Sequence, residues 1–188
     1  MNIIKIKLIG SRPLLMHADC LADPLNPQTK LHKEMTAKRK KSDQDHEAIA
    51  KSEWRSGLYY DEQLGPYLPG ININSAIIEG AKLSKLGKLL NRSIEVMDEK
   101  PRLDYDGPRK IEKLWDARFY DARSVKISTS RIMRYRPIFK KWECTCEIAF
   151  DDEAINRDQL ISCVLDAGKY IGIGDYRPRF GRFTMEVI

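Results

Sequence analysis

The sequence predicts an α+β protein built on an antiparallel sheet. Three segments alternate apolar and polar residues with the period of a strand, two others carry apolar residues at helical spacing, and these strands and helices interleave along the chain. The length of 188 residues, with 42% hydrophobic and 32% charged residues, is typical of one globular domain. We therefore expect a single domain over residues 1–188.

The first strand is predicted over residues 2–10, where "NIIKIKLIG" alternates apolar residues with lysines. Pro13 ends regular pairing because it has no amide hydrogen to donate. The polar, proline-containing stretch that follows opens a large, mainly helical insertion, which we expect over residues 18–70. The insertion is expected to protrude from the core.

Within the insertion, residues 31–57 are rich in good helix formers. Ser42 and Asp45 have the spacing of a capping box, which predicts a second helix that runs through Trp54 and closes at Gly57. The stretch after it predicts two short strands joined at residues 61–65.

Two core helices are expected outside the insertion. The first lies within residues 71–90, with Asn72 or Asn74 as its N-cap and a glycine, Gly80, that predicts close packing against the sheet. Its inward face is expected to comprise Ile73, Ile77, Gly80, Ala81 and Ser84. The second starts at a capping box formed by Asn156 and Gln159 and ends at Gly168.

The remaining strands are predicted over residues 142–150 and 182–188, where alternation is clear, with further strand material in residues 122–141. Residues 92–115 are expected to be irregular. This order of elements is the ferredoxin-like βαββαβ plan, with a core of residues 1–17, 71–90 and 120–188 and one open sheet face.

Cysteine usage and the first residues indicate a cytoplasmic protein. A strand begins at Asn2 with no secretory signal before it, and no segment has the length and hydropathy of a membrane span. Cys144 and Cys146 share one strand face and are expected to fill the core, while Cys20 and Cys163 lie in unrelated contexts. No disulfide framework is implied.

Positive charge is concentrated in residues 122–141, a stretch with seven basic residues and no acidic one in a chain of net charge +6. Solvated surfaces usually mix signs, so we interpret this stretch as facing phosphate, the alternative being a solvated strand pair. Its candidate contacts include Arg123, Lys126, Arg131, Arg134 and Arg136.

The stretch "GKYIGIGDYRPRFGRF", residues 168–183, combines glycines, arginines and tyrosines. Glycines let a backbone approach a ligand closely, guanidinium groups donate to phosphate oxygens, and tyrosine faces can stack on bases. The candidate contacts are Tyr170, Gly172, Gly174, Tyr176, Arg177, Arg179 and Arg182. Alternatively, the glycines only turn the chain and the arginines pair with Asp166, Asp175 or Glu186.

Three stretches, "IKLIGSRPLLMH", "YLPGININSAIIEGA" and "GIGDYRPRFGRF", resemble the CRISPR repeat-associated (RAMP) superfamily, whose folds are like the RNA-recognition motif. The chain is most similar to the backbone-type subunits and to short relatives encoded by tailed phages. The resemblance implies binding of a guide-like RNA, polymerisation of copies along it, and a host cytoplasmic location. The glycine-rich motif matches at Gly172, Gly174, Arg179, Gly181 and Arg182.

Base stacking on the sheet is not expected, since the predicted wet face carries charged residues that can pair across strands in place of aromatic ones. We therefore place binding in the loops and the insertion, including Lys38, Arg39, Lys40 and Lys41. Such contacts read sugar and phosphate, so sequence preference should be weak.

Catalysis and metal binding are minority interpretations. Some members of the superfamily cut RNA with a histidine, which makes His17 the one catalytic candidate. A zinc site from His17, Cys20, His32 and His46 has irregular spacing, and residues 151–153 are better explained by turn and helix-dipole chemistry than by magnesium binding.

The sequence thus predicts a non-catalytic binder of RNA or single-stranded DNA that needs no cofactor or metal. Two alternatives stay open. One is an interaction protein that mimics a subunit of a host RNA-guided complex, in the manner of anti-CRISPR proteins, and the other is a metal-independent endoribonuclease.

Overall fold

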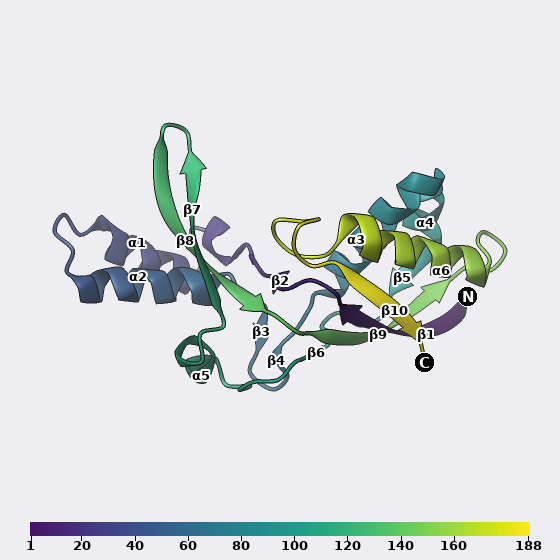
Figure 1. Ribbon diagram of the computed structural model, residues 1–188, viewed down its shortest axis with the longest axis horizontal. Helices are drawn as coiled ribbons and strands as arrows, with labels where there is room; N and C mark the ends of the chain where they lie inside the picture. Colours follow the sequence, from purple (N-terminus) through teal and green to yellow (C-terminus); the bar gives the residue numbers. More distant parts are fainter. The chain divides into compact units, whose positions relative to one another are not determined.

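The computed structural model describes residues 1–188, with the side chain of Ile127 excepted. The chain forms two compact units: the first comprises residues 1–14, 61–106 and 139–188, and the second comprises residues 15–60 and 107–138. Helices and antiparallel sheets occur together, which confirms the predicted α+β class. Figure 1 labels the elements. The expected insertion over residues 18–70 thus corresponds only partly to the second unit, while the single-domain assignment stays a prediction.

The first unit is built on one antiparallel sheet with the strand order β10-β1-β9-β5. The two long central strands are β1 (Asn2–Gly10) and β9 (Glu143–Phe150), and β10 (Phe183–Val187) flanks β1. The short strands β5 (Ile94–Val96) and β6 (Leu103–Asp104) both pair with β9. The three strands predicted from alternation are therefore confirmed, and β1 lies between the other two.

The alternating side chains of this sheet separate a buried face from a wet one. Leu8 lies opposite Cys144 in the register, and both are buried, as are most inward residues of β1 and β9. On the other face Lys5 pairs with Glu147 at 3.4 Å, and Lys7 with Glu143 at 2.6 Å. The expected cross-strand charge pairing is confirmed, and such exposed pairs contribute little to stability.

Two helices pack against the buried face of this sheet, as Figure 1 shows: α3 (Gly70–Ala81) and α6 (Arg157–Asp166). The predicted capping box of α6 is present, because the Asn156 side chain accepts from the Gln159 amide at 2.9 Å and the Gln159 side chain accepts from the Asn156 amide. A π-helical turn (Ala167–Ile171) extends this helix past its expected end at Gly168.

The predicted N-cap of α3 is wrong. The helix starts at Gly70 after Pro69. Gly70 lies so close to the backbone of Asp98 that a Cβ would stand 2.0 Å from its carbonyl oxygen. The helix ends at Ala81, so Ser84 is exposed on a short 3-10 turn (Lys82–Ser84) rather than on the buried face. The next helix, α4, spans Gly87–Ser93.

Gly80 packs against a helix and not against the sheet. A Cβ on Gly80 would lie 2.6 Å from the backbone nitrogen of Ala167, the first residue after α6. The prediction of close packing is confirmed, but its expected partner was wrong, since α3 contacts α6 and the turn that follows it.

Residues 92–115 are more regular than expected. They contain β5, β6 and most of α5 (Ile111–Asp116). The basic stretch also lies elsewhere than predicted: residues 122–138 belong to the second unit and do not contribute a strand to the core sheet.

The second unit combines helices with a long hairpin. Its helices are α1 (Pro27–Ala37), α2 (Asp43–Ser56) and α5, with a 3-10 turn at Cys20–Ala22, and its hairpin is β7 (Tyr120–Ile127) with β8 (Ser130–Phe139). β2 (Leu14–Leu15) joins β8 at the edge. The Ser42–Asp45 capping box and the closure of α2 at Gly57 are both confirmed.

The predicted short hairpin between the insertion and α3 is also present, as β3 (Tyr60–Asp61) and β4 (Gly65–Pro66). The Asp61 carboxylate accepts from Lys100 Nζ at 2.8 Å and from the amides of Gln63 and Leu64 within the turn. These hydrogen bonds lower the pKa of Asp61 to about 2, and the bond from Lys100 has the largest effect.

In the described part of the chain, no helix is long and apolar enough to span a bilayer.

The four free cysteines differ in burial, which predicts their reactivity. Burial raises the pKa of all four thiols, that of Cys146 to about 12, but Cys20 alone is half-buried and therefore within reach of a reagent. Because a reagent must contact the thiolate, we expect one fast-reacting thiol per native chain with Ellman's reagent at pH 8 and four in denaturant. The fast phase should vanish in Cys20→Ser, and fast reaction of all four native thiols would contradict this core.

Candidate nucleic-acid interface

The glycine-rich loop, residues 172–182, connects the end of α6 to β10 and folds back on itself. The Ile173 amide donates to the Gly181 carbonyl at 2.9 Å, and the Gly172 amide donates to the Ala167 carbonyl at 2.8 Å. Gly172 and Gly181 have φ of +76° and +69°, and a Cβ on Gly181 would stand 1.7 Å from the Ile173 oxygen. These two glycines therefore serve the close packing of the loop itself.

This use of glycine changes the predicted roles of two site residues. The Gly172 amide is engaged by the Ala167 carbonyl of the preceding turn, so it is not a free donor to a ligand. Gly174 also has a positive φ, +87°, and lies in the part of the loop that leads to Tyr176. The loop backbone acts mainly to hold its arginines in place.

The same loop is joined to the chain segment that follows β1. The Gly181 amide donates to the Pro13 carbonyl at 2.8 Å, and the Arg182 carbonyl accepts from the amides of Ser11 and Arg12 at 2.9 and 3.1 Å. The Arg12 carbonyl in turn accepts from the indole nitrogen of buried Trp142 at 2.9 Å. These bonds bring Arg12 beside Arg182, although the two are far apart in the sequence.

Three arginines consequently line one open pocket of about 570 Å³ in the first unit: Arg12, Arg179 and Arg182, together with Pro178. A second hollow of about 440 Å³ shares Arg12 and Arg182 with the first and adds Lys169. Arg179 and Arg182 were predicted from the sequence. Arg12 was not, because only the hydrogen bonds between the two segments place it there.

The positive charge of this arginine pocket is uncompensated. Among the described residues, none of the three guanidinium groups forms an ion pair, and the buried Nε of Arg182 has no hydrogen-bond partner. The alternative that Arg177, Arg179 or Arg182 pairs with a neighbouring carboxylate is therefore wrong for the part of the chain described. Like charges held together in this way favour a bound anion.

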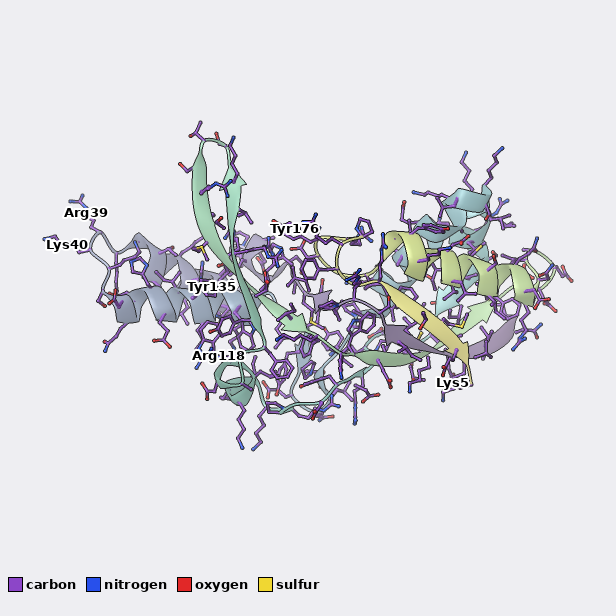
Figure 2. All side chains as sticks on the ribbon, in the orientation of Figure 1. Lys5, Arg39, Lys40, Arg118, Tyr135 and Tyr176 are labelled. Atoms are coloured by element: carbon purple, nitrogen blue, oxygen red, sulfur yellow. The ribbon has the colours of Figure 1, made fainter. Side chains whose placement is uncertain are left out.

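Both predicted tyrosines are accessible in this part of the first unit. Tyr170 is 48% exposed with Lys169 Nζ 4.9 Å from its ring centroid, and Tyr176, labelled in Figure 2, is 41% exposed and contacts Phe180 edge-on. Arg177 is exposed next to Tyr176.

The basic hairpin of the second unit is partly neutralised. Arg123 binds Asp121 with contacts of 2.5 and 2.6 Å, and Arg134 binds Glu53 of α2 at 2.5 Å. Arg131 donates to the Ser124 hydroxyl at 3.1 Å. Asp121 lies just before the stretch that contains only basic residues, and Glu53 lies far from it in the sequence, which is why the sequence suggested a free cationic strand pair.

Arg136 is half-buried on β8 and Lys126 is exposed on β7, so these two hairpin candidates differ in access. In the loop between α1 and α2, Lys38 pairs with Asp45 at 2.6 Å and Lys41 donates to the Lys38 carbonyl. Only Arg39 and Lys40 of that cluster extend freely, and Figure 2 shows them at the tip of the helical pair.

The metal candidates are not assembled into a site. His17 belongs to the second unit and the glycine-rich loop to the first, and the catalytic role of His17 stays a prediction. Across the described residues, no three His, Cys, Asp or Glu side chains are grouped so as to hold a metal ion. Asp151 accepts from the Glu153 amide at 3.1 Å, which is the turn chemistry expected of that acidic stretch.

No known family model matches the sequence, and no curated protein matches it at a significant level.

Proposed function

We propose that the protein is a non-catalytic binder of single-stranded nucleic acid that holds the sugar-phosphate backbone in the arginine pocket. The observation that carries the proposal is the meeting of Arg12, Arg179 and Arg182 around one open pocket without an acidic partner among the described residues. Guanidinium groups offer forked donors that match phosphate oxygens, and the buried Arg182 Nε is a donor that an entering oxygen can satisfy.

An extended polyanion fits this site better than a small free anion. The pocket is open, and Arg12 and Arg182 also line the neighbouring hollow that contains Lys169. Successive phosphates could thus contact successive cations, while the exposed rings of Tyr170 and Tyr176 offer surfaces for unpaired bases. Duplex binding is not needed to explain any of these features.

We further propose that the first unit is a ferredoxin-like fold and that the chain is a divergent relative of the CRISPR repeat-associated superfamily. In support, β1, α3, β5, β9, α6 and β10 follow one another in the chain, and the sheet order β10-β1-β9-β5 is that of a βαββαβ core. The glycine-rich loop that carries the resemblance precedes β10 and supplies two of the three pocket arginines.

Removal of the pocket arginines is the direct test. We expect Arg12→Ala combined with Arg179→Ala to weaken binding of a labelled unstructured oligonucleotide by about 100-fold, since a charged hydrogen bond contributes about 1.5–3 kcal/mol. Fluorescence anisotropy over a series of salt concentrations should also show a shallower slope of log K against log salt. The slope should fall by about 0.7 for each phosphate of the single strand that the variant no longer neutralises.

The matched control is Arg92→Ala combined with Arg157→Ala, which removes the same two charges from exposed positions of the first unit outside the pocket. It should leave both the affinity and the salt slope nearly unchanged. Binding by the native protein that is independent of salt, or an equal loss in this control, would reject the pocket as the phosphate site. Cleavage of a labelled RNA by the native protein would reject the non-catalytic assignment.

A further inference from the structure

A second hollow, of about 560 Å³, lies within the second unit and has a different chemistry. Its walls come from α2, α5 and the base of the β7–β8 hairpin, and Figure 2 labels Arg118 and Tyr135 in this part of the chain. The lining residues that matter are Glu47, Trp115, Asp116, Arg118, Tyr120 and Tyr135.

Three half-buried rings form one continuous aromatic wall in this hollow. Trp115 and Tyr120 are stacked, with centroids 4.7 Å apart and planes at 27°, and Tyr135 lies 6.2 and 6.1 Å from them. Behind the wall, fully buried Trp54 meets Trp115 edge-on at 5.6 Å and donates its indole N–H to the Phe119 carbonyl at 2.8 Å. The wall is therefore held rigidly.

The stacked pair of Trp115 and Tyr120 leaves no room for an ammonium ion between its rings. The two centroids are 4.7 Å apart, so the facing surfaces are already in contact with each other. A rigid wall of this kind suits a flat ring that stacks on its outer surface, as nucleobases do.

The polar groups around the wall can recognise the edge of such a ring. Glu47 and Asp116 carry exposed carboxylates. Arg118 has a φ of +59°, and its backbone amide donates a hydrogen bond to the Trp115 carbonyl at 2.9 Å. Within the described chain none of these three forms an ion pair, so their hydrogen-bonding groups are available. Carboxylates accept from the exocyclic amino groups of bases.

We propose that this aromatic hollow binds a nucleobase that carries an exocyclic amino group, namely cytosine, adenine or guanine, by stacking on the wall and donating to Glu47 or Asp116. Uracil and thymine have no such amino group and are disfavoured. This site is independent of the arginine pocket, because stacking and edge recognition require no phosphate.

Nucleosides, which lack phosphate, test the inference through tryptophan fluorescence. Trp54 and Trp142 are fully buried, so quenching by a stacking base reports on Trp115. We expect cytidine and adenosine to quench saturably and to bind at least about fivefold more tightly than uridine, with little dependence on salt. Tyr135→Ala should weaken the binding of all nucleosides. Glu47→Gln combined with Asp116→Asn should remove the preference for cytidine over uridine.

Glu34→Gln with Glu112→Gln is the matched control, because both carboxylates are exposed in the second unit outside the hollow, and it should preserve the preference. Equal affinity for cytidine and uridine, or no saturable quenching by any nucleoside, would overturn the inference. Competition by tetramethylammonium would overturn it in favour of a cation site. Failure of the arginine pocket would appear separately, as salt-independent oligonucleotide binding with nucleoside quenching intact.

Discussion

The Gly181→Ala variant is expected to unfold about 6–12 °C below the native protein. Gly181 has a φ of +69°, which alone costs an L-residue about 1–2 kcal/mol, and its new Cβ would stand 1.7 Å from the Ile173 carbonyl oxygen. Because that atom belongs to the backbone, a side-chain rotation cannot relieve the overlap. A total of about 3 kcal/mol corresponds to this shift for a chain of this size.

The Gly181→Ala variant should also bind the oligonucleotide more weakly, because Gly181 links the glycine-rich loop to the segment that carries Arg12. Its amide donates to Pro13 and its carbonyl accepts from Ile173, so displacement of Gly181 opens the arginine pocket. Gly57→Ala is the control: Gly57 has a φ of −87°, and the nearest atom to its Cβ would be Pro137 Cδ at 3.3 Å. Calorimetry should find Gly57→Ala within about 3 °C of native, and a similar result for Gly181→Ala would contradict the loop geometry.

Trp54→Ala is expected to destabilise the second unit by about 4 kcal/mol, because truncating a fully buried tryptophan leaves a cavity in the core. Trp54 is 1% exposed, packs against Trp115 and donates to the Phe119 carbonyl. The Ile138 amide also donates to that carbonyl, at 3.1 Å, so removal of the indole leaves the oxygen with one of its two partners.

The Trp54→Phe variant separates packing from hydrogen bonding. Phenylalanine retains much of the apolar ring but loses the N–H, so a loss of about 1–2 kcal/mol is expected. Urea denaturation followed by circular dichroism measures both variants. Equal stability of Trp54→Ala and native protein would show that Trp54 does not anchor the aromatic wall, and nucleoside quenching should then also be unaffected.

The sequence predicted those parts of the fold whose signals are local and long. Strand β1 alternates over nine residues, and the capping boxes at Ser42 and Asn156 each need only four. Strand β5 was missed because three residues are too few to show a period. The start of α3 was missed because its N-cap residue, Pro69, makes no side-chain cap, whereas the expected N-caps were asparagines.

The residues of the candidate sites could likewise be predicted only where they lie close together in the sequence. Arg179 and Arg182 were predicted because they share one short motif with the glycines, whereas Arg12 enters the pocket only through hydrogen bonds to Arg182. The aromatic hollow was not predicted, since helix α2, helix α5 and the hairpin each contribute only a few of its residues. A local sequence pattern cannot indicate a site that is formed by residues from separate segments.

The polypeptide passes between its two compact units four times, near residues 14, 60, 106 and 138. Neither unit is therefore a continuous stretch, and trimming from either terminus removes strands of the first unit before it releases the second. An isolated first unit would require two internal excisions, each rejoined by a short linker. Gene rearrangement could exchange the second unit only as two separate pieces that must change together.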